Sequence, residues 1–188
     1  MLTKPLSYGE MEIIRSHFGE TFKSNQPFGQ MFQHDVTSRL LIYPTDGTYL
    51  DEQQFIALIE SIKAIGESGF YISEVEAEPD PFVLPNNNEM YHPAHWICDF
   101  PITIDEYRDL TIVLDNALFS KNGKWGMLIS NEGHAVLGGT NEFINHFKRL
   151  YPSWVNCFTE FEKMCEYNRN KYNTNMHWYD DFVKHIFN

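Results

Sequence analysis

The chain has 188 residues, enough for one domain with its own core, and we treat residues 1–188 as a single globular domain. Hydrophobic residues make up 43% and aromatic residues 15%, which excludes a disordered protein, because disorder requires few aromatic side chains and low hydrophobicity. No apolar run approaches the roughly 20 residues that cross a bilayer, and the N-terminus lacks the pattern of a signal peptide. We therefore expect a cytoplasmic protein with no membrane partner.

The net charge is -12, from 26 acidic and 14 basic side chains. This excess repels phosphate backbones, so we expect no nucleic-acid partner, and it would speed the encounter with a basic protein. Solubility alone is the simpler explanation of such a charge. The three cysteines, Cys98, Cys157 and Cys165, are odd in number and form no C-x-x-C pair, which is typical of a reduced compartment.

The N-terminal elements follow hydrophobic periodicity. A helix is predicted over 7–19, where apolar residues recur at helical spacing. Residues 23–37 are polar and contain glycine, proline and asparagine, so we expect a loop there. A short buried strand follows over 39–44. The clearest helix begins after Asp51 and ends at Gly66.

The middle of the chain alternates strands and loops. Strands are predicted over 70–78 and 95–100, separated by a proline- and asparagine-rich loop over 79–93. A structureless loop of that length is often functional. Capping-box spacing predicts a short helix over 103–110. Residues 111–114 are compatible with either helix or strand.

A three-stranded meander is predicted over 117–138. The Asn-Gly dipeptide at 122–123 is typical of a two-residue hairpin turn, and a second tight turn is expected at 132–133. This register places Phe119 opposite Gly126, where we expect the aromatic ring to cover the bare backbone.

Three helices complete the chain, over 140–150, 153–168 and 176–187. Together these elements predict an α+β fold with a mostly antiparallel sheet and helices packed on one face.

The glycine-rich stretch at 138–139 precedes a helix, which is the position of a phosphate-binding loop. The stretch matches neither established glycine motif, and Glu142 places a negative charge in the first helical turn. A strand-to-helix turn that uses the conformational freedom of glycine is therefore favoured. His134 lies beside Glu132 at the predicted hairpin tip, without a nucleophile, so we interpret it as a polar turn residue.

A dense cluster of potential metal ligands contains His92, His95, Cys98 and Asp99. On a strand, His95 and Asp99 share one face while Cys98 points to the other, and no second ligand pair completes a tetrahedron. We favour a loop followed by a buried cysteine and predict no cofactor. A small metal-dependent enzyme built on these residues is the alternative.

An acidic row is predicted on the strand over 70–78. Glu74, Glu76 and Glu78 would share one face, followed by Asp80, and neighbouring carboxylates repel one another unless the face meets solvent or cations. These residues are the predicted partner-binding site. An edge strand protected by its charge is the alternative.

The segment 116–154, from "NALFSKNGKWGMLISNEGHAVLGGTNEFINHF" to "YPSW", resembles small bacterial immunity-type proteins of polymorphic toxin systems. The matching features are the Asn-Gly hairpin, a Trp-Gly pair, a Gly-Gly pair and an aromatic-rich helix. The resemblance implies a non-catalytic cytoplasmic protein that neutralises a cognate toxin by direct contact, and it carries no inhibitory residues with it. A structural or regulatory module with a solubilising charge is the remaining alternative.

Overall fold

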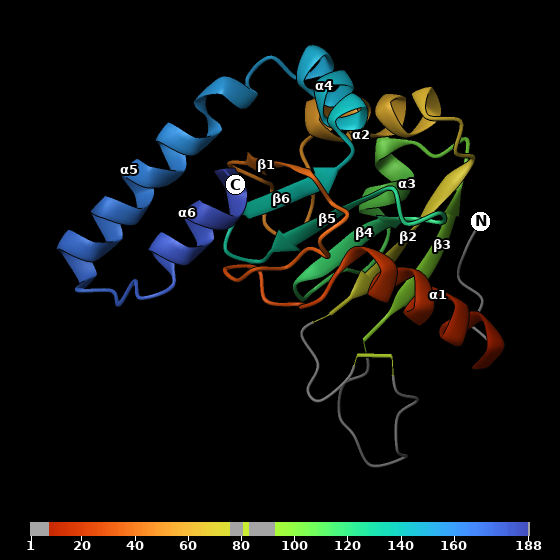
Figure 1. Cartoon of the computed structure of the whole chain (residues 1–188), viewed down its shortest axis with the longest axis horizontal. Helices are drawn as coiled ribbons and strands as arrows, with labels where there is room; N and C mark the ends of the chain where they lie inside the picture. The colour runs from red at the N-terminus through yellow and green to blue at the C-terminus, as the bar shows by residue number, and fades with distance from the viewer. Residues whose placement is uncertain (1–7, 76–80, 83–92, 188) are drawn as a thin grey trace.

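The computed structural model describes residues 8–75, 81–82 and 93–187, and these form a six-stranded sheet with helices packed on it (Figure 1). The strand order is β1-β6-β5-β4-β2-β3, and every neighbouring pair is antiparallel. The strands are β1 (Ser38–Ile42), β2 (Gly69–Glu74), β3 (His95–Asp99), β4 (Asn116–Ser120), β5 (Trp125–Ser130) and β6 (His134–Gly139). The helices are α1 (Tyr8–Thr21), α2 (Glu52–Ala64), α3 (Ile104–Arg108), α4 (Asn141–Leu150), α5 (Trp154–Tyr172) and α6 (Tyr179–Phe187). The predicted α+β class with a mostly antiparallel sheet is confirmed.

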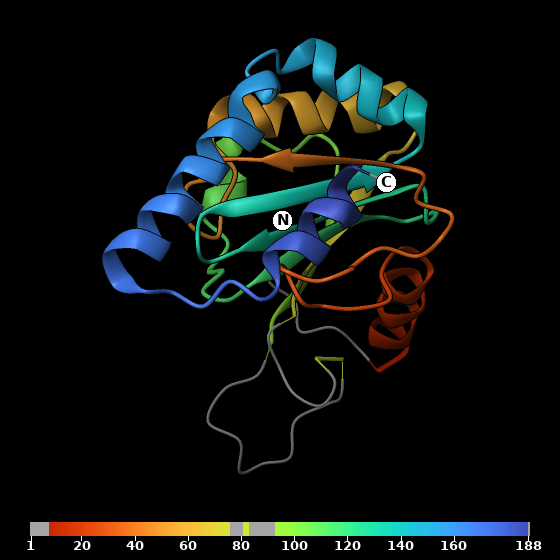
Figure 2. The same cartoon turned by 60° about the vertical axis from the view of Figure 1, so that its left-hand side comes forward.

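Both faces of the sheet carry helices, so the expectation that they pack on one face only is wrong. Side chains alternate along each strand, and the sheet therefore separates two hydrophobic clusters. Phe70 and Met127 belong to the cluster under α2, α3 and α4, whereas Tyr71 and Leu128 belong to the cluster under α1, α5 and α6. Figure 2 shows α2 and α4 together on one side of the sheet, with α1 and α6 on the other. Strand apolarity alone could not reveal this, because buried positions look alike whichever helix covers them.

Helix α5 passes the β1 edge of the sheet and serves both clusters. Its first turns contribute Cys157 to the α2–α4 side, and later turns contribute Phe161 and Cys165 to the other side. The helix runs to Tyr172, four residues beyond the predicted end, and stops at Asn173, which adopts a left-handed conformation with φ of 54°. A covered edge strand is protected from pairing with other chains.

Side-chain caps fix the starts of three helices where the sequence predicts them. Asp51 and Thr103 each form a capping box with the residue three positions later, and Thr140 accepts a hydrogen bond from the Phe143 amide. Residues 111–114, which were compatible with helix or strand, are neither.

The segment between α1 and β1 differs most from its prediction as a polar loop. It has no helix or strand, but it buries Phe22, Met31, Phe32 and Val36 against the sheet. Phe22 and Phe32 form an isolated antiparallel bridge, and their rings stack with centroids 5.3 Å apart. This segment, residues 22–37, therefore replaces a helix as part of the second layer. We call it the packed segment.

Two strand glycines make room for the packed segment. Gly126 lies opposite Gly138 across β5 and β6. A Cβ at Gly126 would lie 2.6 Å from Phe22 Cζ, and a Cβ at Gly138 would lie 2.7 Å from Phe32 Cζ. Both distances are far below van der Waals contact, so each ring rests on bare backbone.

The two glycine expectations are corrected accordingly. Phe119 does pair with Gly126 in register, as predicted, but the atoms that approach Gly126 come from Thr21 and Phe22. The glycines at 138–139 lie within β6, and neither has a positive φ, so they do not form a strand-to-helix turn. Gly126 and Gly138 are needed because a side chain at either position would collide with the packed segment. The turn glycines Gly123 and Gly133 have positive φ, but Asn122 does not. The turn at 122–123 is therefore not the two-residue type I′ turn that the Asn-Gly dipeptide predicts, because that turn needs positive φ at both central residues.

We predict that Gly138→Ala lowers the free energy of unfolding by about 1–3 kcal/mol, because the added methyl group forces Phe32 off the sheet. Gly19→Ala is the matched control, since a Cβ at this helical position meets nothing within 4 Å. It should be neutral or stabilise the protein by up to about 1 kcal/mol. Urea unfolding of both variants measures the difference. Equal stability of Gly138→Ala and the wild type would contradict the proposed packing.

Candidate functional site

Glu74, the first residue of the predicted acidic row, is buried. Its side chain is 1% exposed, and its two oxygens accept hydrogen bonds from the Ala94 and Val113 amides at 2.9 and 2.8 Å. Strand β2 lies between β4 and β3, so it is not an edge strand. The expectation of a solvated carboxylate face is therefore wrong at Glu74, which ties three segments of backbone together. Glu76, Glu78 and Asp80 lie outside the described residues, and their role stays a prediction.

The predicted metal ligands do not converge. Cys98 points into the α2–α4 cluster, whereas Asp99 is exposed and accepts a hydrogen bond from the Lys121 ammonium. His95 Nε2 contacts the Pro81 carbonyl oxygen at 3.0 Å, and its ring stacks on Phe82. Within residues 8–75, 81–82 and 93–187, no three His, Cys, Asp or Glu side chains are grouped as metal ligands. His92 lies outside these ranges.

Burial favours the uncharged forms of both His95 and Cys98. Burial lowers the pKa of His95 to about 4, although the Pro81 carbonyl and Glu74 oppose the shift. Burial also raises the pKa of the Cys98 thiol to about 12. Near pH 7 the imidazole is therefore uncharged and the thiol is protonated.

His134 is a core residue, which corrects its interpretation as a polar turn residue. It is the first residue of β6, is 1% exposed, and contacts the rings of Phe28, Phe161 and Phe182. Its Nε2 lies 3.2 Å from the Pro27 carbonyl oxygen, which anchors the packed segment to the sheet. Burial lowers the pKa of His134 to about 4, with the Pro27 carbonyl acting in the opposite direction.

A further buried carboxylate, Glu67, was not singled out by the sequence. One oxygen accepts a hydrogen bond from Ser120 Oγ at 2.6 Å, and the other accepts one from the Trp125 indole at 3.3 Å. The residue is 7% exposed and lies in the connection between α2 and β2. These hydrogen bonds link the α2–β2 connection to β4 and β5, so we interpret Glu67 as a residue that stabilises the fold.

Three exposed carboxylates lie near Cys165 and Tyr43, where α5 packs on β1. Glu132 comes from the β5–β6 turn, and Glu160 and Glu162 flank the buried stripe of α5. We call these three residues the acidic surface. Glu162 accepts a hydrogen bond from the Tyr179 hydroxyl of α6 at 3.2 Å, and Figure 1 shows α5 and α6 side by side.

The glutamates of the acidic surface raise the pKa values of two nearby residues, Cys165 and Tyr43. Burial raises the pKa of Cys165 to about 11, and Glu162 and Glu132 raise it further while Arg169 lowers it. The pKa of Tyr43 is likewise raised by burial first, and then by Cys165 and Glu160. Carboxylates from two distant segments therefore act on one small region, where a positively charged group from a partner would be attracted.

No signal in the sequence identifies the acidic surface. Glu160 and Glu162 have the spacing of an ordinary solvated helix flank, and Glu132 is a typical turn residue. Their common position around Cys165 and Tyr43 depends on the non-local packing of α5 against β1.

No protein-family model, curated protein or solved structure matches the chain. Within the described part of the chain, none of the helices has the length and apolar character needed to cross a membrane.

The buried histidines predict a pH dependence of stability. His134 has a folded-state pKa of about 4 against the ordinary histidine pKa of 6.5, so between these values only the unfolded chain binds the proton. Stability therefore falls as the pH is lowered through this window. We expect His134 alone to account for a loss of roughly 2 kcal/mol between about pH 7 and about pH 5.

Urea unfolding of wild type and His134→Gln at both pH values measures this loss. The variant should be less sensitive to pH, whatever its stability at neutral pH. The exposed His177, replaced in His177→Gln, provides the control and should leave the wild-type sensitivity unchanged. If His134→Gln is as sensitive to pH as the wild type, His134 is not the source.

Proposed function

We propose that this chain is a non-catalytic cytoplasmic protein that binds a basic protein partner, and that it acts as an immunity protein against a cognate bacterial toxin. The observation that carries the proposal is the acidic surface, formed by Glu132, Glu160 and Glu162 in a chain with a net charge of -12. The resemblance of residues 116–154 to immunity-type proteins supports the same class of function.

The physical basis of binding would be charge complementarity. Long-range attraction between the acidic surface and a basic partner speeds the encounter, and local ion pairs then select the orientation. A toxin that handles nucleic acid carries the cationic groups needed to hold phosphates. An acidic protein that occupies those groups excludes the substrate without any chemistry of its own.

The position of the acidic surface suits this role. Two of its carboxylates, Glu160 and Glu162, lie on α5, which is anchored through Cys157, Phe161 and Cys165, and Glu132 lies in the tight turn between β5 and β6. A surface that is already ordered loses little conformational entropy when it binds. Lys and Arg side chains of a partner would be attracted to these exposed carboxylates.

The test uses the full chain and the purified product of the neighbouring gene. Calorimetric titration of the wild type should give a complex whose affinity falls as NaCl is raised from about 50 to about 300 mM, because salt screens exposed charges. The triple variant Glu132→Lys, Glu160→Lys and Glu162→Lys should bind at least about tenfold more weakly at low salt and show a smaller salt dependence.

The control is Glu12→Lys, Glu20→Lys and Glu60→Lys, which changes the net charge equally at exposed helical positions on α1 and α2. It should retain affinity within about threefold. Equal weakening by both variants would mean that only net charge matters and that the acidic surface is not the interface.

Co-expression tests the inhibitory role separately from binding. The wild-type chain should restore growth of cells that produce the neighbouring gene product, and the triple variant should not. A neighbouring product that is not toxic, or whose toxicity the wild type does not relieve, would overturn the immunity proposal even if the two proteins bind.

A further inference from the structure

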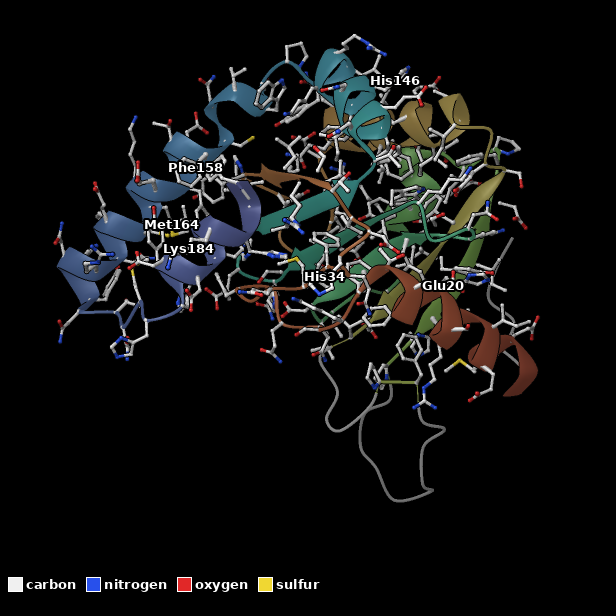
Figure 3. All side chains as sticks on the ribbon, in the orientation of Figure 1. Glu20, His34, His146, Phe158, Met164 and Lys184 are labelled. Atoms are coloured by element: carbon white, nitrogen blue, oxygen red, sulfur yellow. The ribbon has the colours of Figure 1, made fainter. Side chains whose placement is uncertain are left out.

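A basic pocket lies between the packed segment, β1 and α6. Its volume is about 370 Å³. Three cations line it, each from a different element: Lys23 follows α1, Arg39 lies on β1 and Lys184 lies on α6. Figure 3 labels two side chains that border it, His34 and Lys184.

The side chains that line the pocket carry a positive net charge, whereas the protein as a whole is strongly negative. The chain has 26 acidic and only 14 basic residues, yet three of those basic residues meet here and none of the lining residues is Asp or Glu. Such a concentration of like charge is unfavourable unless solvent or an anion balances it.

Arg39 is the least compensated of these groups. It is half-buried, and burial lowers the pKa of its guanidinium. One nitrogen, Nη1, donates to the His185 carbonyl oxygen at 3.1 Å, whereas the buried Nε has no hydrogen-bond partner in the described structure. A partly desolvated guanidinium gains most from an anion that accepts from it directly.

The other two cations are free to turn toward a ligand. Lys23 Nζ donates to Gln30 Oε1 at 3.2 Å, and Lys184 Nζ lies 3.5 Å from Asp181 Oδ1 in a largely exposed pair. Exposed contacts of this kind contribute little to stability, so a ligand displaces them at low cost. Both ammonium groups can therefore close over an anion held by Arg39.

Two of the lining residues, Phe32 and His185, are buried aromatic side chains. The rings of Phe32 and His185 stack with centroids 5.9 Å apart, and both residues are buried. His185 Nε2 accepts a hydrogen bond from the Met31 amide at 3.1 Å, so the neutral ring carries its proton on Nδ1. Burial lowers the pKa of His185 to about 4, and the positive charges of Arg39 and Lys23 lower it further.

We propose that this pocket binds the phosphate group of a small phosphate ester. The guanidinium and two ammonium groups supply the charge and donors that a phosphate dianion requires, and no carboxylate lines the pocket. The volume is at the lower end of the range of small-molecule sites and exceeds what a phosphate ion fills, which leaves room for an organic part beside the Phe32 and His185 rings. The surrounding negative charge disfavours a long nucleic-acid backbone.

Calorimetric titration of the full chain in phosphate-free chloride buffer tests the proposal, with inorganic phosphate, ribose 5-phosphate and succinate as probes. We expect ribose 5-phosphate to bind with a Kd on the order of 1 mM or tighter, inorganic phosphate more weakly, and succinate most weakly. Lys23→Gln combined with Lys184→Gln should weaken binding of ribose 5-phosphate by at least about tenfold.

The matched control is Lys124→Gln combined with Lys163→Gln, which removes the same charge at exposed positions outside the pocket and should bind as the wild type does. Arg39→Lys keeps the charge but loses the guanidinium geometry, and it should also weaken binding. Unfolding curves establish that this variant is folded.

Three results would overturn the proposal. The first is no binding of either phosphate compound at about 10 mM. The second is equal affinity in the two double variants, which would place the anion elsewhere. The third is succinate binding as tightly as ribose 5-phosphate, which would make this a carboxylate site. None of these outcomes bears on the acidic surface, which is tested separately.

Discussion

The packing of two phenylalanine rings on bare sheet backbone is the contact on which much of this structure depends. Gly126 and Gly138 face each other across β5 and β6, and together they leave a place on the sheet where Phe22 and Phe32 can lie. A side chain at either position would hold the rings away from the sheet. The packed segment follows from this contact, although it forms neither helix nor strand.

The packed segment in turn positions polar groups far from it in sequence. The Pro27 carbonyl oxygen contacts His134 Nε2, and the Met31 amide donates a hydrogen bond to His185 Nε2 of α6. These bonds attach the segment to β6 and to the last helix. The same segment contributes Lys23 and His34 to the basic pocket. The shape of the pocket therefore depends on the packing of the Phe22 and Phe32 rings against the sheet.

Local sequence rules predicted most of the helices and strands, but they predicted few of the contacts between segments that are distant in the sequence. The capping residues Asp51, Thr103 and Thr140 and the turn glycines act over a few residues, and the structure agrees with them. The packed segment was missed because its apolar residues follow no regular period, and their burial depends on glycines about a hundred positions away. Polar residues were misplaced for a related reason. Glu74 and His134 look solvated by type, yet backbone groups from other segments satisfy them inside the fold.

The sheet glycines also constrain how this sequence can change over time. Gly126 and Gly138 are 12 positions apart on adjacent strands, and each is matched to one ring of the Phe22–Phe32 pair. A larger residue at one of these glycines is tolerated only if the facing ring becomes smaller, so we expect the four positions to vary together in descendants of this chain. Two glycines and two aromatic residues at these separations are therefore a more specific signature of common ancestry than the turn motifs, which unrelated hairpins acquire independently.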